Sequence, residues 1–193
     1  MRSIESFHYY GSDIEIIVVL PGDQIEYWKE LCEKYQFKIK HHIVAGGDIR
    51  FYSVKNGLEL IKPDGMVAIH DGVRPLIDLN TISKCFEVAG NKGNAIPVVD
   101  LVDSIRELKP DGSSQHIDRN KFKLIQTPQV FQTNLILKAY EQEYSNSFTD
   151  DASVLEAMLP GTIQLVEGNR RNIKITTTED LKYAEAIFKD LVS

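Results

Sequence analysis

Charged side chains directly follow the mainly apolar run Met66–His70, which is predicted to be a strand. Parallel α/β sheets bind their ligands just beyond the carboxyl ends of their strands, so these charges lie where a ligand is expected. The segment reads His70-Asp71-Gly72-Val73-Arg74-Pro75. Arg74 carries a planar fork that can bind phosphate, and Asp71 can accept from a sugar hydroxyl or help to place a metal ion. A local Asp71–Arg74 ion pair that only shapes the turn is the alternative, and we favour the functional interpretation. His70 is expected to be structural rather than an acid–base catalyst.

A second candidate segment is Gly46-Gly47-Asp48-Ile49-Arg50, with Ser53 one turn further on. Paired glycines let the backbone approach a ligand closely, and a helix that starts here presents free amide groups to an anion. Arg50 and Ser53 would lie along the first helical turn. Taken alone, the pair of glycines is a weak signal, and a plain connection between a strand and a helix is the simpler explanation.

Three further segments carry polar groups at the ends of predicted strands. In Gln126-Thr127-Pro128-Gln129 the proline holds Thr127 extended, and the threonine hydroxyl can donate to phosphate; turn geometry explains the segment equally well. Phe148-Thr149-Asp150-Asp151-Ala152 resembles a helix N-cap with acidic residues in the first turn. Lys174 lies between two isoleucines, so on an interior strand it needs a partner such as phosphate, whereas an exposed edge strand would make it ordinary.

The groups in these loops favour one kind of chemistry. They contain no Ser-His-Asp order, no cluster of metal ligands and no pair of general bases. They do contain hydroxyls, a few basic groups and glycine amides. That set suits phosphoryl or nucleotidyl transfer, in which catalysis consists of positioning and charge neutralisation.

The elements that position these loops follow from the hydrophobic pattern. Strands are expected at Ile14–Leu20, His42–Val44, Met66–His70, Asn94–Val99, Leu124–Gln126, Ile163–Val166 and Asn172–Ile175. Helices are expected from Ile25 to Tyr35 with Asp23 as N-cap, through Val54 and Leu58, from Asp78 through Val88, at Thr133–Tyr144, from Thr149, and at Thr178–Leu191. The alternation predicts one α/β domain over residues 1–193, with a mostly parallel sheet and helices on both faces.

One stretch, at about residues 103–119, interrupts the alternation. Ser104–Leu108 and Gln115–Asp118 read as two strands around the turn Lys109-Pro110-Asp111-Gly112, with no helix between them. Such a pair would project as a β-arm. From this segment alone, a contact with a second copy of the chain and a simple solvent-exposed hairpin are both open.

The bulk composition excludes several classes of protein. The chain has 193 residues, of which 42% are hydrophobic and 26% charged, which is ordinary for a globular domain. Its net charge of −6 argues against bulk binding of nucleic acid or of an anionic membrane. Cys32 and Cys85 have no metal-type spacing and are expected to be reduced thiols, and no run is long and apolar enough for a signal peptide or a membrane span. A cytoplasmic location is therefore predicted.

Taken together, these segments resemble one family, 2-C-methyl-D-erythritol 4-phosphate cytidylyltransferase of the non-mevalonate isoprenoid pathway. The matching stretches run in the family's order and are Ala45–Val54, His70–Pro75, Asp118–Asn120, Gln126–Phe131, Thr149–Ser153, Leu165–Gly168 and Asn172–Thr176. The resemblance implies a Rossmann-like nucleotidyltransferase domain. It also implies a reaction that joins CTP to methylerythritol phosphate, yields CDP-methylerythritol and pyrophosphate, and uses Mg²⁺.

The resemblance also assigns roles by position. It places the nucleotide at Gly46, Gly47, Asp48, Arg50 and Ser53; the catalytic groups at Lys174, Arg74 and Asp71; the phosphorylated substrate at Asp71, Arg74, Ser104, Arg119, Thr127, Thr149 and Lys174; and a metal, weakly, at Asp71. In that family the arm forms a homodimer and its arginine, here Arg119, reaches into the neighbouring site.

The chain departs from the family at its start. Family members open with a strand, a glycine-rich loop that carries an arginine, and a Pro-Lys-Gln segment, whereas Met1–Phe7 resembles the helix that follows them. The resemblance therefore implies that part of the phosphate cradle is missing from this chain, and the sequence leaves its activity open. Two alternatives remain: a ribitol-5-phosphate cytidylyltransferase, and a non-catalytic dimeric relative that binds a phosphorylated metabolite.

Overall fold

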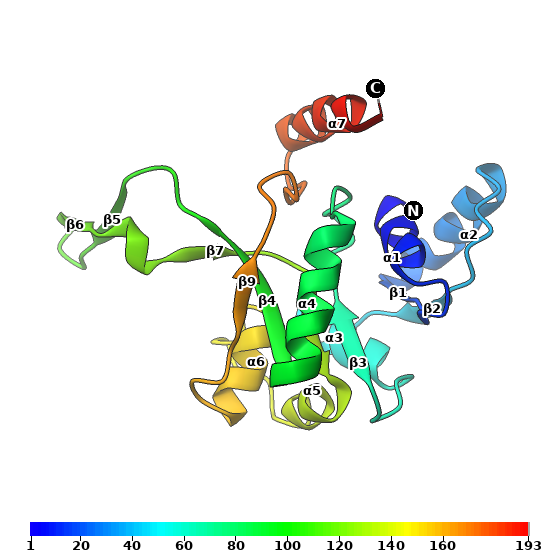
Figure 1. Cartoon of the computed structure of the whole chain (residues 1–193), viewed down its shortest axis with the longest axis horizontal. Helices are drawn as coiled ribbons and strands as arrows, with labels where there is room; N and C mark the ends of the chain where they lie inside the picture. Colours follow the sequence, from blue (N-terminus) through cyan, green and yellow to red (C-terminus); the bar gives the residue numbers. More distant parts are fainter. Residues whose placement is uncertain (193) are drawn as a thin grey trace.

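The computed structural model describes residues 1–192 (Figure 1). The strands are β1 (Ile17–Leu20), β2 (His42–Ala45), β3 (Met66–Ile69), β4 (Asn94–Asp100), β5 (Ile105–Leu108), β6 (Ser114–Ile117), β7 (Lys123–Ile125), β8 (Gln129–Gln132) and β9 (Leu165–Glu167). The α-helices are α1 (Arg2–Tyr10), α2 (Ile25–Lys34), α3 (Arg50–Leu58), α4 (Leu79–Lys92), α5 (Thr133–Ala139), α6 (Asp151–Met158) and α7 (Thr178–Val192).

The central sheet is built around β4 and β8. β8 pairs antiparallel with both β3 and β4, and β4 also pairs parallel with β9 and antiparallel with β7. Strands β3, β4 and β9 therefore run in one direction, with β8 and β7 opposed to them. β1 and β2 form a separate parallel pair. Because β3, β4 and β9 share a direction, the segments that follow them meet at one edge of the sheet.

Helices cover both faces of this sheet, which confirms the predicted α/β class. Successive residues of a strand point to opposite faces, so Val130 of β8 packs with α4 while Phe131 packs with α3, α5 and α6. Ala95 and Ile96 of β4 divide in the same way. All four side chains are fully buried, and this two-sided core fixes the edge where the candidate site lies.

Several local predictions need correction. β8 is not among the predicted strands. Helix α2 begins after a 3₁₀ turn at Gly22–Gln24, so Gln24 and not Asp23 is the N-cap residue. Helix α5 ends at Ala139, because the side-chain amide of Gln142 donates to the Ala139 carbonyl at 2.8 Å and closes the helix there.

The structure also tests the predicted cap of α4 and the predicted strand after β9. The Asp78 cap of α4 is confirmed, since its carboxylate accepts from the Thr81 amide at 2.9 Å. The predicted strand Asn172–Ile175 is wrong: the segment is not a strand, and the Ile175 amide donates instead to the Val73 carbonyl at 2.9 Å. This contact holds the segment against the turn that follows β3.

The predicted arm is formed by β5 and β6, which pair antiparallel and project away from the central sheet in Figure 1. Leu108 is 79% exposed and Val102, at the base of the arm, is 62% exposed, whereas Ile105 and Ile117 are partly buried. Among the helices of residues 1–192, none combines the length and apolar character that a membrane crossing requires.

Candidate active site

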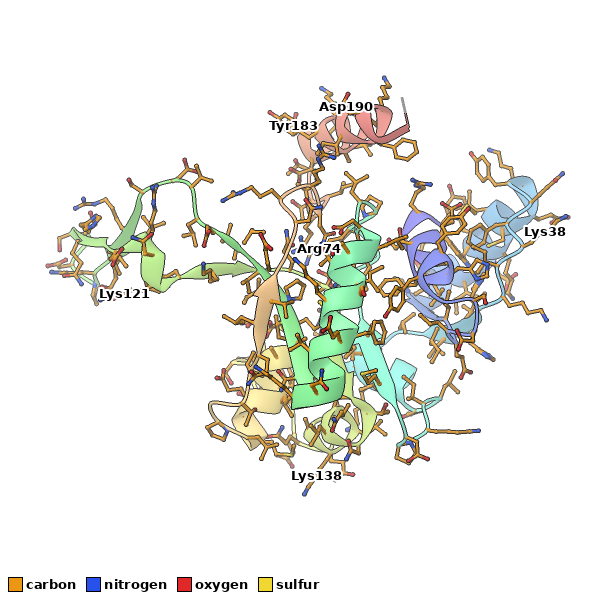
Figure 2. The ribbon with its side chains drawn as sticks, in the orientation of Figure 1. Lys38, Arg74, Lys121, Lys138, Tyr183 and Asp190 are labelled. Atoms are coloured by element: carbon orange, nitrogen blue, oxygen red, sulfur yellow. The ribbon has the colours of Figure 1, made fainter. Side chains whose placement is uncertain are left out.

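The carboxylate of Asp71 lies among three cationic side chains at the edge of the sheet. Lys174 Nζ is 3.0 Å from Asp71 Oδ2, Arg50 Nε is 3.4 Å from Oδ1, and Arg74 Nε is 3.7 Å from Oδ2. The four residues come from the start of α3, from the turn after β3 and from the extended segment after β9. Figure 2 shows Arg74 near the centre of the molecule, between the arm and the N-terminal region.

These cations keep Asp71 ionised. Partial burial opposes its charge, but the hydrogen bond from Lys174 and the charges of Arg50 and Arg74 outweigh this and lower the pKa of the carboxyl below its ordinary value. The side chain of Lys174 is 44% exposed, whereas that of Asp71 is 14% exposed. Lys174 is therefore the most exposed cation of this cluster, ahead of Arg50 at 37% and Arg74 at 12%, and its ammonium is paired with Asp71.

The guanidinium of Arg74 donates hydrogen bonds to backbone carbonyl groups of the protein. Its Nη1 donates to the carbonyl of Asn172 at 2.8 Å and its Nη2 to that of Ile125 at 3.5 Å, and the side chain is only 12% exposed. Burial lowers the pKa of Arg74, and the charge of Asp71 opposes the shift. In this arrangement Arg74 ties three segments together rather than presenting an open fork to phosphate.

Arg50 is likewise engaged. Its two terminal nitrogens donate to the two oxygens of Asp151 at 2.8 and 2.7 Å, and Asp151 is completely buried. The hydroxyl of Tyr140 donates to the same carboxylate at 2.6 Å. Burial opposes the charge of Arg50, but the hydrogen bond and charge of Asp151 outweigh it and raise the pKa of Arg50. Arg50 thus joins the start of α3 to the start of α6, with its Nε toward Asp71.

Thr127 and His70 lie beneath the Asp71 turn. The Asp71 amide donates to Thr127 Oγ1 at 3.1 Å, and Thr127 Oγ1 lies 3.1 Å from His70 Nδ1. Burial, against the opposing hydrogen bond at the Arg74 carbonyl, lowers the pKa of His70 to about 4, so its ring is neutral at pH 7. These contacts agree with the expected structural role of His70. Thr127 is 5% exposed, and its hydroxyl bonds within the protein.

The glycine segment folds into a tight loop before α3. Ser53 Oγ accepts from the Gly47 amide at 3.2 Å and donates toward the carbonyl of Ile49 at 3.1 Å. A Cβ on Gly47 would lie 2.4 Å from Tyr52 Cβ, so this close approach requires glycine. Gly46 has a similar restriction, since its Cβ would lie 2.8 Å from Ser53 Oγ. Asp48 is exposed at the tip of the loop.

The remaining predicted residues lie at the border of the cluster or away from it. Thr149 is exposed just before α6, and its amide donates to Ser153 Oγ at 3.0 Å. Ser104 and Arg119 are exposed on the arm, and Arg119 donates to the carbonyl of Val102 there. The structure therefore brings Arg50, Asp71, Arg74, Thr127 and Lys174 together, but it does not bring the arm residues to the same site within one chain.

Two glutamines that the sequence did not single out hold the surrounding loops. The side chain of Gln126 donates through Nε2 to the backbone carbonyl of Asn169 at 2.9 Å. Its Oε1 accepts from the backbone N–H of Asn169 at 3.2 Å. Gln129, fully buried, donates to Asp150 Oδ2 at 2.7 Å and accepts from the Ala152 amide at 2.8 Å. The only signal for them in the sequence was their place on either side of Thr127-Pro128.

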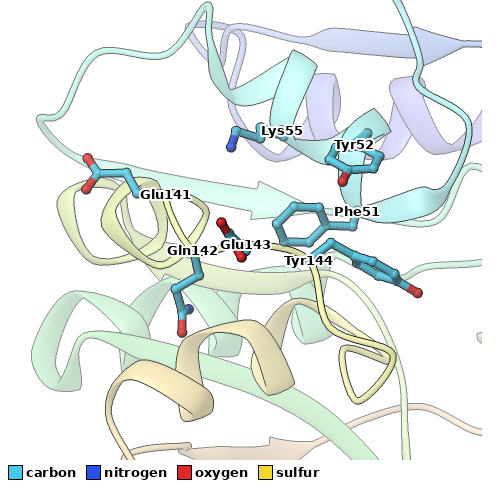
Figure 3. Close-up of a pocket in the computed structure, with 7 residues that line it drawn as sticks. All are labelled: Phe51, Tyr52, Lys55, Glu141, Gln142, Glu143 and Tyr144. Atoms are coloured by element: carbon cyan, nitrogen blue, oxygen red, sulfur yellow. The ribbon is translucent and has the colours of Figure 1, made fainter.

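A cavity of about 480 Å³ opens elsewhere, between α3 and the loop after α5 (Figure 3). Its lining consists of Phe51, Tyr52, Lys55, Glu141, Gln142, Glu143 and Tyr144. None of the predicted site residues belongs to it. The chemistry of the Asp71 cluster, with its several converging charges, makes that cluster and not this cavity the candidate active site.

The cluster does not fit a metal ion held by protein ligands alone. Within residues 1–192, no three His, Cys, Asp or Glu side chains converge as a set of metal ligands. Asp71 is surrounded by cations, which compete with any metal for its oxygens. Mg²⁺ typically binds one or two carboxylates together with substrate phosphates and waters, so these residues suit an ion that arrives with a phosphate ligand.

An α/β sheet with a partly exposed lysine, a partly buried acid and two arginines at one edge carries the groups that a nucleotidyltransferase needs to bind phosphate. The family model of 2-C-methyl-D-erythritol 4-phosphate cytidylyltransferase matches residues 1–190, and the chain belongs to that family. A relative of that name from Phocaeicola vulgatus is 51% identical over 187 residues, which cover 97% of this chain and 84% of the relative. One from Bacteroides fragilis is 52% identical over 188 residues, with the same coverage.

A solved structure agrees with the sequence comparisons. The crystal structure of 4-diphosphocytidyl-2C-methyl-D-erythritol synthase from Anaerococcus prevotii superposes with a TM-score of 0.85 at 28% identity, covering 97% of this chain and 84% of that one. The expected family and fold class are thus confirmed, and the separate roles of the site residues remain predictions.

Proposed function

We propose that this chain joins CTP to 2-C-methyl-D-erythritol 4-phosphate, giving CDP-methylerythritol and pyrophosphate. An oxygen of the methylerythritol phosphate attacks the α-phosphorus of CTP, the bond from that phosphorus to the bridging oxygen of the β-phosphate breaks, and pyrophosphate leaves. The observation that carries the proposal is the half-exposed Lys174, held 3.0 Å from the partly buried Asp71 at the edge of the sheet.

The roles of the residues follow from their exposure. Lys174 faces the ligand and offsets the negative charge that gathers at the α-phosphate in the transition state. Asp71 and Arg74 fix the position of Lys174 and of the turn around it, since their own polar atoms mostly bond within the protein. The glycine loop with Asp48 and Ser53 lies at the nucleotide side, where its backbone can approach the base and ribose. Exposed Thr149 lies on the side of the phosphorylated polyol.

Mg²⁺ enters this proposal as a partner of the CTP phosphates. It neutralises charge on the triphosphate when it is bound there. Asp71 is the one carboxylate of the cluster with an exposed fraction, and its three cationic neighbours make it a weak ligand on its own.

A homodimer through the arm completes the proposal. An isolated two-stranded hairpin is marginally stable in water, and this arm exposes Leu108 with Val102 at its base. Phe122 and Leu124, which lead back into the sheet, are 45% and 52% exposed. A second copy would cover these side chains and bring Arg119 to the partner's site. Light scattering should give the mass of a dimer, and Leu108→Glu should shift it toward the monomer.

The free thiols of Cys32 and Cys85 suit the cytoplasm.

The first test is pyrophosphate release from CTP and methylerythritol phosphate with Mg²⁺. Lys174→Ala should lower turnover by about 10²–10³-fold, the range for removing one transition-state donor. Lys38→Ala, an exposed lysine far from the cluster (Figure 2), is the matched control and should leave turnover unchanged. Equal effects of the two substitutions would remove Lys174 from the mechanism.

The same assay separates the alternatives. Release with ribitol 5-phosphate, but not with methylerythritol phosphate, would identify the ribitol enzyme. Binding of CTP by the folded chain without any release would favour a non-catalytic relative. The Asp71 cluster is compatible with phosphate in each case, so substrate choice is decided by the assay.

A further inference from the structure

His70 is linked by hydrogen bonds to both ends of the Asp71–Arg74 turn, directly at Arg74 and through Thr127 at Asp71. It directly follows β3, and its ring has a polar contact at each nitrogen: Nε2 lies 3.0 Å from the carbonyl of Arg74, and Nδ1 lies 3.1 Å from Thr127 Oγ1. Phe7 of α1 covers the ring edge-on, with centroids 5.4 Å apart. The imidazole therefore lies behind the turn rather than in the path of a ligand.

The chemistry of the partners fixes the direction of each hydrogen bond. A carbonyl only accepts, so the proton of the neutral ring must be on Nε2, where it donates to Arg74. Nδ1 is then an acceptor and receives the hydroxyl proton of Thr127. The threonine oxygen in turn accepts from the Asp71 amide at 3.1 Å. The order is Asp71 amide to Thr127, Thr127 to His70, and His70 to the Arg74 carbonyl.

This closed chain has a consequence for the site. The turn contributes Asp71, which holds Lys174, and Arg74, which holds the carbonyl of Asn172 two residues before Lys174. A shift of the turn by a fraction of an ångström would move both supports of Lys174 together. Misplacement by about 1 Å at a reacting group can cost on the order of 10²-fold in rate.

We propose that His70 is a positioning residue for the nucleotidyl-transfer site, acting through the hydrogen-bond chain Asp71–Thr127–His70–Arg74. The inference rests on the proposed function for its effect on turnover. Its structural part, the direction of the hydrogen bonds and the anchoring of the turn, stands without that function.

His41 provides a matched control. It also bonds through both ring nitrogens, but with the opposite pattern: Nε2 accepts from the indole of Trp28 at 2.9 Å, and Nδ1 donates to the Ile39 carbonyl at 2.8 Å. It precedes β2, at the opposite end of that strand from the glycine loop. The two histidines should therefore be opposite tautomers in one protein.

The first measurement is long-range ¹H–¹⁵N NMR of the wild-type chain at one neutral pH. We expect a proton on Nε2 of His70 and on Nδ1 of His41. A proton on Nδ1 of His70 would reverse the hydrogen-bond chain and overturn the proposal. This result needs neither turnover nor a variant that folds.

The second measurement uses substitutions that divide the two contacts. His70→Gln can keep the donor toward Arg74, His70→Asn can keep the acceptor for Thr127, and His70→Phe keeps neither. We expect kcat to fall by about 30–100-fold in His70→Phe and by less in the two amides, with KM for CTP within about threefold. His41→Phe should leave kcat unchanged, and an equal loss there would show that the effect is general destabilisation.

Hydrogen exchange of the Asp71 amide separates failure of the inference from failure of the proposed function. Its exchange should speed up at least tenfold in His70→Phe and stay unchanged in His41→Phe. If the wild type releases no pyrophosphate, the proposed function fails while the exchange result still decides whether His70 anchors the turn. Unchanged Asp71 exchange in a folded His70→Phe protein would overturn the inference.

Discussion

The contact between Arg50 and Asp151 offers a sharp test of how this site is held together. Asp151 is completely buried, and three hydrogen bonds reach its carboxylate: two from Arg50, at 2.8 and 2.7 Å, and one from Tyr140, at 2.6 Å. Arg50→Met keeps much of the aliphatic volume but removes the charge and both donors. The substitution leaves a buried carboxylate with one remaining partner.

The size of the effect follows from that geometry. Removing one partner of a buried ion pair typically costs about 3–5 kcal/mol, because the other charge stays buried without compensation. Tyr140 still donates to the carboxylate, and a hydrogen bond to a charged group contributes about 1.5–3 kcal/mol. We therefore expect the lower end, about 3 kcal/mol. For a chain of this length, that corresponds to a fall in Tm of about 6–12 °C.

The assay is chemical denaturation followed by circular dichroism at pH 7, with Lys29→Met as control. Lys29 forms an exposed ion pair with Glu26, and such pairs contribute about 0–1 kcal/mol. Adding Asp151→Asn to Arg50→Met should recover about 1 kcal/mol or more, because no buried charge then remains. A loss below 1 kcal/mol in Arg50→Met, or no recovery in the double variant, would refute the reasoning.

Three other outcomes follow from the structure. Gly47→Ala should destabilise the protein by about 1–3 kcal/mol in a denaturation assay, because its Cβ would lie 2.4 Å from a tyrosine Cβ, whereas Gly22→Ala meets nothing within 4 Å and should be neutral. The amide of Thr176 holds the pKa of the Asp180 carboxyl at about 2, so the stability difference between wild type and Asp180→Asn should be present above pH 3.8 and vanish as pH falls toward 2; a constant difference over that range would contradict this. Burial raises the pKa of the Cys85 thiol in α4 to about 12, so at pH 8 a thiol reagent should label at most one of the two cysteines of the native chain. Equal labelling rates for both cysteines would show that Cys85 is accessible and that α4 is open.

Those parts of the fold that depend on neighbours in the sequence were predictable. Helix α4 shows why: Asp78 caps its first turn and Gly93, with φ of 94°, ends it, and both signals lie within the helix or next to it. β8 shows the opposite case. Its four residues begin and end with glutamine, and only its position between β3 and β4 buries the first three of them. A short polar-ended strand of this kind carries no periodicity that local pattern can detect.

The candidate site divides along the same line. Asp71 and Arg74 are three residues apart, and their charges after an apolar strand predicted a functional turn. Arg50 and Asp151 lie 101 positions apart, so the sequence could not show that the terminal nitrogens of Arg50 bond to Asp151. The assignment of Arg50 to the nucleotide came from the family resemblance and stays a prediction. Lys174 was predicted to need a partner such as phosphate if it lay on an interior strand; the segment is not a strand, and Asp71 is the anionic partner in this structure. Residue type predicted the need for a partner, but only the fold decides which partner meets it.

The segment from Gln126 to Gln129 explains why these distant residues share one geometry. Gln126 bonds to the loop at Asn169, Thr127 to the turn at Asp71, and Gln129 to the cap at Asp150. Each bond goes to a different loop, and each loop carries at least one predicted site residue or lies just before one. Because a single short segment binds all three loops, their relative positions depend on its hydrogen bonds as well as on the strands. The polar residues that follow β7 thus hold the loops of the site in place, and under the proposed function the exposed Lys174 supplies the charge that a phosphate would meet.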